Sequence, residues 1–100
     1  MFKEWLAVRR KNYELLRRIA DQVGRQFEEM PYIVLADPLQ PVSYEREIDG
    51  IKISWSADVV RTKPNGDIDF SIEFYSDLPT IFGAKPSHRF WKRRDETVYY

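Results

Sequence analysis

The first thirty residues carry apolar side chains at the spacing of an α-helix. At about 100° per residue, one stripe roughly 100° wide collects most of the large apolar side chains of this segment. Its members are Phe2, Trp5, Leu6, Tyr13, Leu16, Ala20, Val23, Phe27 and Met30. Pro31 ends the pattern, because the residue before a proline is pushed out of the helical region. The segment predicts one amphipathic helix over about residues 2–29.

Two polar residues interrupt this stripe. Arg9 lies along its middle and Asn12 lies near its edge. In one interpretation this end of the helix overhangs the sheet, and Arg9 extends to water or pairs with a sheet carboxylate. In the other interpretation this end of the helix meets another subunit. The sequence leaves both interpretations open.

Two segments after the helix have the features of strands. Residues 32–36 form a short apolar run bounded by prolines, which favours a strand. Asp49-Gly50 is a favoured two-residue turn, because both central positions of a type I′ turn need positive φ. This turn predicts a hairpin in which Ile48 faces Ile51 and Tyr44 faces Trp55.

Residues 51–59 and 67–75 alternate between apolar and polar positions, as strands with one buried face do. The acidic residues on the predicted hydrated face are Asp58, Asp67, Asp69 and Glu73. A loop of two or four residues would pair Val59 with Ile72 and keep both apolar rows together, and this is the preferred register. A three-residue loop would need a bulge at Val59-Val60 to do the same.

The chain beyond Leu78 is punctuated by prolines and a glycine. One helical turn is expected at residues 80–82. Residues 88–93 fit a strand, with a short helix over residues 87–95 as the alternative. A turn at residues 94–96 would then lead into a last strand at residues 97–100.

The elements together predict a two-layer α+β fold, with one long N-terminal helix packed across an antiparallel β-meander of four to six strands. A chain of 100 residues without a linker is expected to form a single α+β domain over residues 1–100. The predicted core comprises Leu6, Leu16, Ile19, Ala20, Val23 and Phe27 from the helix and Ile33, Leu35, Ile48, Ile51, Ile53, Trp55, Val59, Ile68, Phe70, Ile72 and Phe74 from the sheet. The element order resembles that of cystatin-like folds and of some small bacterial chaperones and immunity proteins, but no motif carries this resemblance to particular residues.

Composition narrows the location and the partners of the chain. Sixteen basic and sixteen acidic residues cancel, so no overall field attracts nucleic acid or an anionic membrane. The chain has no cysteine, which excludes disulfides and cysteine-based metal sites and favours the cytoplasm. No apolar run approaches a signal-peptide core or a membrane span, so a cytoplasmic protein without a membrane partner is expected.

Residues suited to catalysis or metal binding are sparse. His88 is the single histidine, and its basic and aromatic neighbours favour a surface position. Residues 65–69 lack the spacing of a calcium loop and are explained by a turn. No phosphate-binding, hydrolase or kinase motif occurs. We therefore predict no cofactor, no metal site and no catalytic residue, which favours a non-enzyme.

The strongest functional signal lies in residues 89–94. Arginine and tryptophan are favoured anchors at protein interfaces, while basic side chains interleaved with aromatic ones also suit phosphates and unpaired bases. A third interpretation places Phe90 or Trp91 in the core and pairs the arginines with the acidic sheet. The leading prediction is a small non-enzymatic binding module whose partner is a protein or a second copy of the chain, and weak nucleic-acid binding is the alternative. The candidate contact residues are Arg89, Trp91, Lys92, Arg93, Arg94 and Arg9.

Overall fold

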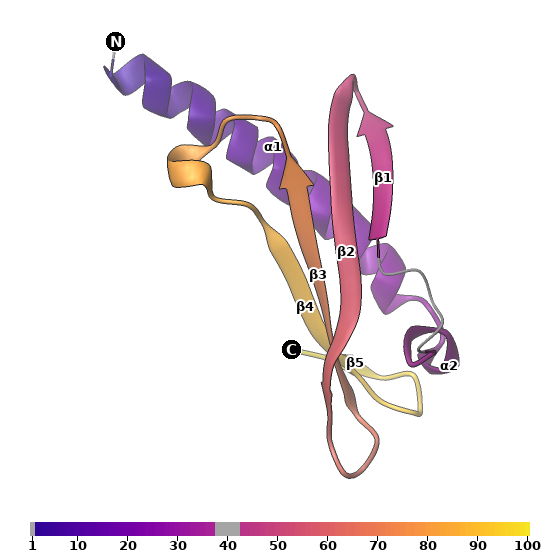
Figure 1. Cartoon of the computed structure of the whole chain (residues 1–100). Helices are drawn as coiled ribbons and strands as arrows, with labels where there is room; N and C mark the ends of the chain where they lie inside the picture. Colours follow the sequence, from indigo (N-terminus) through magenta and orange to yellow (C-terminus); the bar gives the residue numbers. More distant parts are fainter. Residues whose placement is uncertain (1, 38–42) are drawn as a thin grey trace.

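A computed structural model of the chain describes residues 2–37 and 43–100 and contains one long helix and a five-stranded antiparallel sheet (Figure 1). The helical elements are α1 (Phe2–Glu28), α2 (Tyr32–Leu35) and the 3₁₀ turn η1 (Ile81–Gly83). The strands are β1 (Ser43–Ile48), β2 (Ile51–Thr62), β3 (Ile68–Ser76), β4 (Ser87–Lys92) and β5 (Val98–Tyr99). They pair in the order β1-β2-β3-β4-β5, which confirms the predicted α+β meander.

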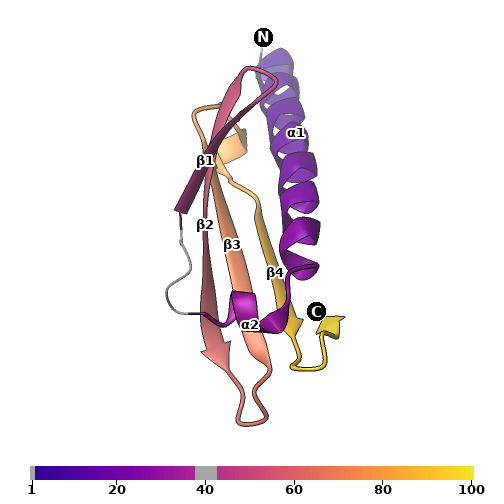
Figure 2. The same cartoon turned by 90° about the vertical axis from the view of Figure 1, so that its right-hand side faces the viewer.

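The helix and the sheet form two layers, with α1 lying along one face of the sheet (Figure 2). The core between them consists of the apolar faces of both layers. From α1 come Leu16, Ile19, Ala20, Val23 and Phe27, and from the strands come Ile53, Trp55, Ala57, Ile68, Phe70, Ile72, Phe74 and Phe90. The ring of Phe70 joins the layers, because its centroid lies 5.6 Å from that of Phe27 and 5.5 Å from that of Phe90. Aromatic pairs at such distances add to the stability given by burial alone.

The helix is longer than the part of it that covers the core. Every buried residue of α1 lies at or after Leu16, and Leu6, which was predicted to lie in the core, is only half-buried. The first turns of α1 project past η1, beyond the edge of the sheet (Figure 1). The molecule is accordingly elongated, with principal extents of 53 × 23 × 17 Å.

Residues 32–36 do not form the predicted strand. Tyr32–Leu35 is the short helix α2, in which Val34 and Leu35 donate to the carbonyl of Pro31 at 3.0 and 3.2 Å. Leu35 is buried as predicted, whereas Ile33, also assigned to the core, is exposed. A short apolar run carries no period that separates a strand from a helical turn, and here the proline begins the turn.

The hairpin at Asp49-Gly50 has the predicted geometry. Both residues have positive φ, 51° and 78°, as a type I′ turn requires. Ile48 faces Ile51 and Tyr44 faces Trp55 across β1 and β2, as expected.

The preferred register between β2 and β3 is wrong. Val59 faces Phe70 rather than Ile72, and the pairing shifts between Val59 and Arg61. Lys63 donates to the carbonyl of Asp67 at 2.8 Å, which closes a three-residue loop. The bulge that this loop requires falls at Val60, and it keeps Val59 toward the core while Arg61 sits opposite Asp69 on the outer face.

The last third of the chain follows the predicted order of elements. The helical turn is η1, and residues 87–92 form the strand β4 rather than the alternative short helix. A turn at residues 94–96 leads into β5, with Glu96 at a φ of 78°. The carboxylate of Glu96 accepts from the backbone N–H of Tyr32 at 2.7 Å, so this turn also holds the start of α2.

Candidate functional site

The alternation of β4 divides the predicted contact segment between the two faces of the sheet. Arg89 and Trp91 lie on the outer face, and Phe90 is in the core, as the third interpretation allowed. Lys92 is buried on the inner face, where its Nζ donates to the carbonyl of Glu28 at 2.7 Å. Its positive charge there lies at the C-terminal end of α1, where the helix dipole favours a cation.

The two remaining basic residues of the segment follow the strand. Arg93 reaches Asp67 on the outer face, with 3.8 Å between its Nε and Oδ2 of the carboxylate. Arg94 packs its guanidinium against Gly66 in the β2–β3 loop. The structure therefore brings Arg89, Trp91 and Arg93 together and separates Lys92 and Arg94 from them.

Asp69 organises the arginines of the outer face. Arg89 donates to both carboxylate oxygens, through Nε at 2.8 Å and Nη2 at 2.5 Å, and Nε of Arg61 donates to Oδ2 at 3.0 Å. The Arg89 hydrogen bonds, reinforced by Arg61, lower the pKa of Asp69, and the same pair raises the pKa of Arg89.

Asp67 and Asp69 do not form the hydrated row that the alternation predicted. Both side chains are buried, and Asp69 is only 1% exposed, beneath the guanidinium groups. The binary pattern of the strand places these aspartates on the correct face, but it carries no information about which side chains cover them.

The aromatic rings of this region are covered by cations of the same chain. The Trp91 and Tyr99 rings lie 5.9 Å apart and 8° from parallel. Lys63 lies 4.4 Å from the Trp91 centroid and 5.3 Å from that of Tyr99, Arg61 lies 5.0 Å from Trp91, and Arg93 lies 4.7 Å from Tyr99. The hydroxyl of Tyr99 donates to Asp67 at 2.7 Å. The outer-face cluster, as we call this group, comprises Arg61, Lys63, Asp67, Asp69, Arg89, Trp91, Arg93 and Tyr99.

His88 does not lie at the surface as predicted. Its ring packs against Gly24 of α1, where a Cβ would leave it no room, and Nε2 lies 2.7 Å from Oε2 of Glu28. The hydroxyl of Tyr100 also hydrogen-bonds to Glu28, and this bond raises the pKa of Tyr100. These contacts fasten α1 to β4 and to the residue that follows β5. Among the described residues, no three histidine or acidic side chains gather closely enough to hold a metal ion.

Arg9 and Asn12, the polar residues of the helical stripe, bind the loop that precedes η1. Nη1 of Arg9 donates to the carbonyl of Thr80 at 2.8 Å, and Nδ2 of Asn12 donates to that of Pro79 at 2.8 Å. The Arg9 guanidinium also lies 4.2 Å from the centroid of the Trp5 ring. The partner of Arg9 within the chain is thus a loop carbonyl and not a sheet carboxylate.

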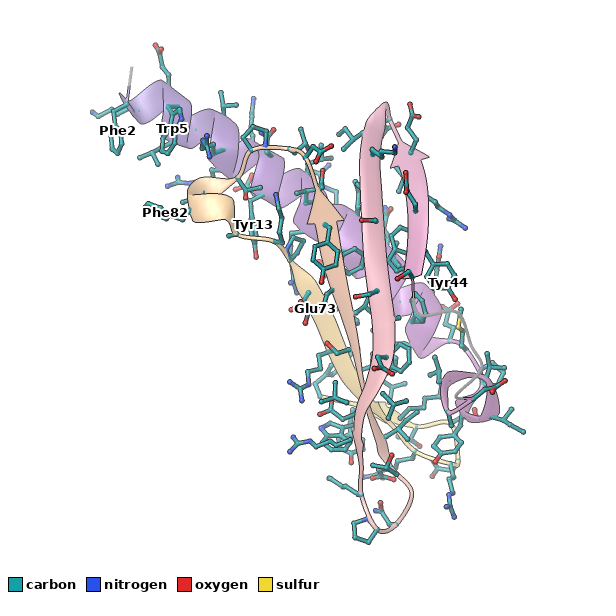
Figure 3. The ribbon with its side chains drawn as sticks, viewed as in Figure 1. Phe2, Trp5, Tyr13, Tyr44, Glu73 and Phe82 are labelled. Carbon is teal, nitrogen blue, oxygen red and sulfur yellow. The ribbon has the colours of Figure 1, made fainter. Side chains whose placement is uncertain are left out.

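Beyond Arg9, large apolar side chains are open to solvent. Phe2 is 71% exposed, Trp5 42%, Val8 58% and Phe82 92%. Phe2 and Trp5 stack with 5.9 Å between their ring centroids, and Phe82 projects from η1 near the same end of the molecule (Figure 3). A shallow groove lined by Glu4, Trp5, Val8, Arg9 and Pro79 separates the helix from the loop. We call Phe2, Trp5, Val8 and Phe82 the aromatic end.

The four side chains of the aromatic end were not among the predicted contact residues, although one interpretation of Arg9 placed another subunit at this end of the helix. Phe2 and Trp5 share the apolar stripe that packs on the sheet further along α1, and Phe82 stands alone in a loop. Arg9 was the one available signal, because a charged residue in the middle of the stripe marks where the sheet stops covering it.

Comparisons with known proteins add no identity to this geometry: no family model matches the chain, and no significant match was found among curated proteins or solved structures. Within residues 2–37 and 43–100, no helix combines the length and the apolar character needed to cross a membrane.

Proposed function

We propose that the chain is a small, non-enzymatic protein-binding module that holds its partner through the aromatic end. The observation that carries this proposal is the gathering of four large, exposed apolar side chains at one end of an elongated molecule. Exposed patches of this kind mark interaction sites, and tryptophan and phenylalanine are enriched at the centres of interfaces.

The rigidity of the aromatic end supports the proposal. The hydrogen bonds from Arg9 to Thr80 and from Asn12 to Pro79 tie the first turns of α1 to the loop that presents Phe82. A surface that is already ordered loses less conformational entropy on binding than a mobile one. The aromatic end therefore suits an anchor that enters a preformed pocket.

The charges around the aromatic end indicate the chemistry of the partner. At helical spacing, Lys3, Arg10 and Lys11 fall roughly on the side of α1 opposite Trp5. The contact face therefore carries the Arg9 guanidinium, stacked on Trp5, together with Glu4 at the edge of the groove. We infer an apolar pocket on the partner protein, and a second copy of the chain is one such partner. A cytoplasmic location belongs to the same proposal, supported by the absence of cysteine.

The double variant Trp5→Gln/Phe82→Asn tests the proposal. Light scattering over a range of concentrations first shows whether the partner is a second copy. If the chain is monomeric, a photoreactive residue at position 82 identifies the partner in the native host, and calorimetry measures its affinity for the purified chain. We expect the double variant to weaken binding by about thirtyfold or more, the effect of losing a hot spot.

The matched control is Ile33→Gln, which removes an exposed apolar side chain from α2. This variant should leave the affinity unchanged. Equal affinity of the wild type and the double variant for the partner would contradict the proposal, as would a monomer that forms no adduct from position 82.

Weak nucleic-acid binding, the alternative function, would use the outer-face cluster instead of the aromatic end. The cluster supplies cations for phosphates, but the cations over Trp91 and Tyr99 occupy ring faces on which bases would stack. An oligonucleotide titration, included in the experiment below, tests this alternative.

A further inference from the structure

The outer-face cluster presents its positive charge to solvent and hides its negative charge. The side chains of Arg61, Arg89 and Arg93 are 66%, 53% and 50% exposed. The carboxylates beneath them are 1% exposed at Asp69 and 8% at Asp67. A molecule that approaches the cluster therefore meets guanidinium groups before Asp67 and Asp69. Beside Arg89 the same face also carries the exposed carboxylates of Asp58 and Glu73.

The buried carboxylates also hold the arginines in place. Arg89 commits Nε and Nη2 to Asp69, and Arg61 commits Nε. A guanidinium carries five N–H donors, so both side chains retain terminal N–H groups for an outside acceptor. Two arginines ordered in advance bind an oxyanion at a lower cost in side-chain entropy than free ones.

The sheet sets the spacing of these donors. Arg61 extends from β2 and Arg89 from β4, with β3 between them. Both guanidinium groups nevertheless converge on Oδ2 of Asp69 in β3, and Arg93 lies at Asp67, two residues before it. The two carboxylates are about 7 Å apart along the strand. A ligand that engages the cations at both carboxylates must therefore be an extended chain with several anionic groups rather than a single small anion.

The covered rings favour an acidic polypeptide over a nucleic acid as this anionic chain. Lys63 lies over both Trp91 and Tyr99, and Arg93 lies over Tyr99, so a nucleobase could stack there only by displacing them. Carboxylate side chains need no ring face, and they match the fork geometry of arginine in a bidentate manner.

We infer that the outer-face cluster is a second binding site, which takes an acidic segment of a protein rich in aspartate or glutamate. This inference goes beyond the proposed function, because the site lies on the outer face of the sheet and shares no residue with the aromatic end. The chain would then contact two protein surfaces at once.

A direct test measures the anisotropy of fluorescein-labelled hexaglutamate and of a labelled oligothymidylate with the full chain, at low and at physiological salt. Hexaglutamate should bind, more weakly as salt rises, and more tightly than the oligothymidylate. Arg61→Gln/Arg93→Gln removes two exposed cations but keeps the bond between Arg89 and Asp69. We expect it to weaken hexaglutamate binding by about tenfold or more.

Arg10→Gln/Arg18→Gln is the matched control, because it removes the same charge from exposed positions of α1. It should change the affinity for hexaglutamate by no more than about twofold. Equal losses in both double variants, tighter binding of the oligothymidylate or no binding of hexaglutamate at low salt would each overturn the inference. Trp5→Gln/Phe82→Asn should bind hexaglutamate like the wild type, which separates failure of this inference from failure of the proposed function.

Discussion

The outer-face cluster and the aromatic end contain the same kinds of side chain in opposite states. Trp91 stacks on Tyr99 and lies under Lys63 and Arg61. Trp5 has Arg9 over its ring and Phe2 beside it, and it remains 42% exposed. Phe82, on the adjoining loop, is almost wholly exposed.

The difference shows that an aromatic and basic composition does not itself identify a binding surface. In the cluster, cations of β2, of the loop after it and of the segment after β4 cover the ring faces, and these contacts stabilise the fold. At the aromatic end the sheet stops short, and the rings remain available to another molecule. Loss of a covered ring should therefore reduce stability, and loss of an open ring should reduce binding. The predictions below test this separation.

The largest expected effect is at Phe70, a buried ring in contact with those of Phe27 and Phe90. Phe70→Ala should lower the free energy of unfolding by about 3–5 kcal/mol, because it removes buried surface and leaves a cavity. Urea denaturation measures this loss. A loss near that of a surface substitution, about 0.5 kcal/mol, would mean that Phe70 does not join the two layers.

Asp69→Asn should have the next largest effect. Asp69 is buried, and the variant removes the negative charge that accepts hydrogen bonds from Arg89 and Arg61. We expect a loss of about 2 kcal/mol in the free energy of unfolding. A variant as stable as the wild type would show that the arginines do not depend on this carboxylate.

The same residue predicts a dependence on pH. Because the pKa of Asp69 is lower in the folded chain, its contribution to stability is complete above the pKa of an unfolded aspartate, about 4, and is lost as the pH falls through the folded pKa. The stability difference between the wild type and Asp69→Asn should therefore shrink in acid. A stability difference that stayed constant from about pH 7 to about pH 2 would contradict this assignment.

Trp91→Ala should cost less than either of these changes, about 1–2 kcal/mol, because its ring is half-buried and contacts Tyr99, Lys63 and Arg61. Thermal and urea unfolding both report this loss. If Trp91→Ala left the free energy of unfolding unchanged, the contacts between the cations and the rings of the cluster would not stabilise the fold.

Phe82→Asn should have the smallest effect on stability, within about 0.5 kcal/mol of the wild type. Phe82 is 92% exposed and has a φ of 52°, a conformation that asparagine tolerates well. A large loss in urea denaturation would mean that Phe82 supports the fold rather than a partner.

Local patterns predicted much of the fold. The α1 stripe, the Asp49-Gly50 turn and the alternation of β2 and β3 are each specified within a short stretch of sequence, and all three form as expected. Residues 32–36 are too short to show a period, and Pro31 starts a helical turn there. The β2–β3 register depends on the bulge at Val60. A three-residue loop with this bulge and an even loop without it both keep the apolar rows together, so the apolar pattern did not decide between them.

The candidate sites were harder to predict, because the tertiary structure decides which side chains are covered by others and which stay exposed. The burial of Asp69 depends on arginines eight residues before it and twenty residues after it in the sequence. The exposure of Phe2 and Trp5 depends on where the sheet ends, whereas their spacing is that of core residues. Whether residues 89–94 contact a partner stays a prediction, now limited to the outer-face members Arg89, Trp91 and Arg93.

The three tryptophans of the chain allow the most direct test, because Trp5 is at the aromatic end, Trp91 is in the outer-face cluster and Trp55 is in the core. Labelling with 5-fluorotryptophan gives each position its own ¹⁹F resonance, which can be followed while the partner recovered from position 82, or a rising concentration of the chain itself, is added. The account predicts that the Trp5 resonance shifts while those of Trp91 and Trp55 stay in place. A shift of Trp91 with Trp5 unmoved would contradict it.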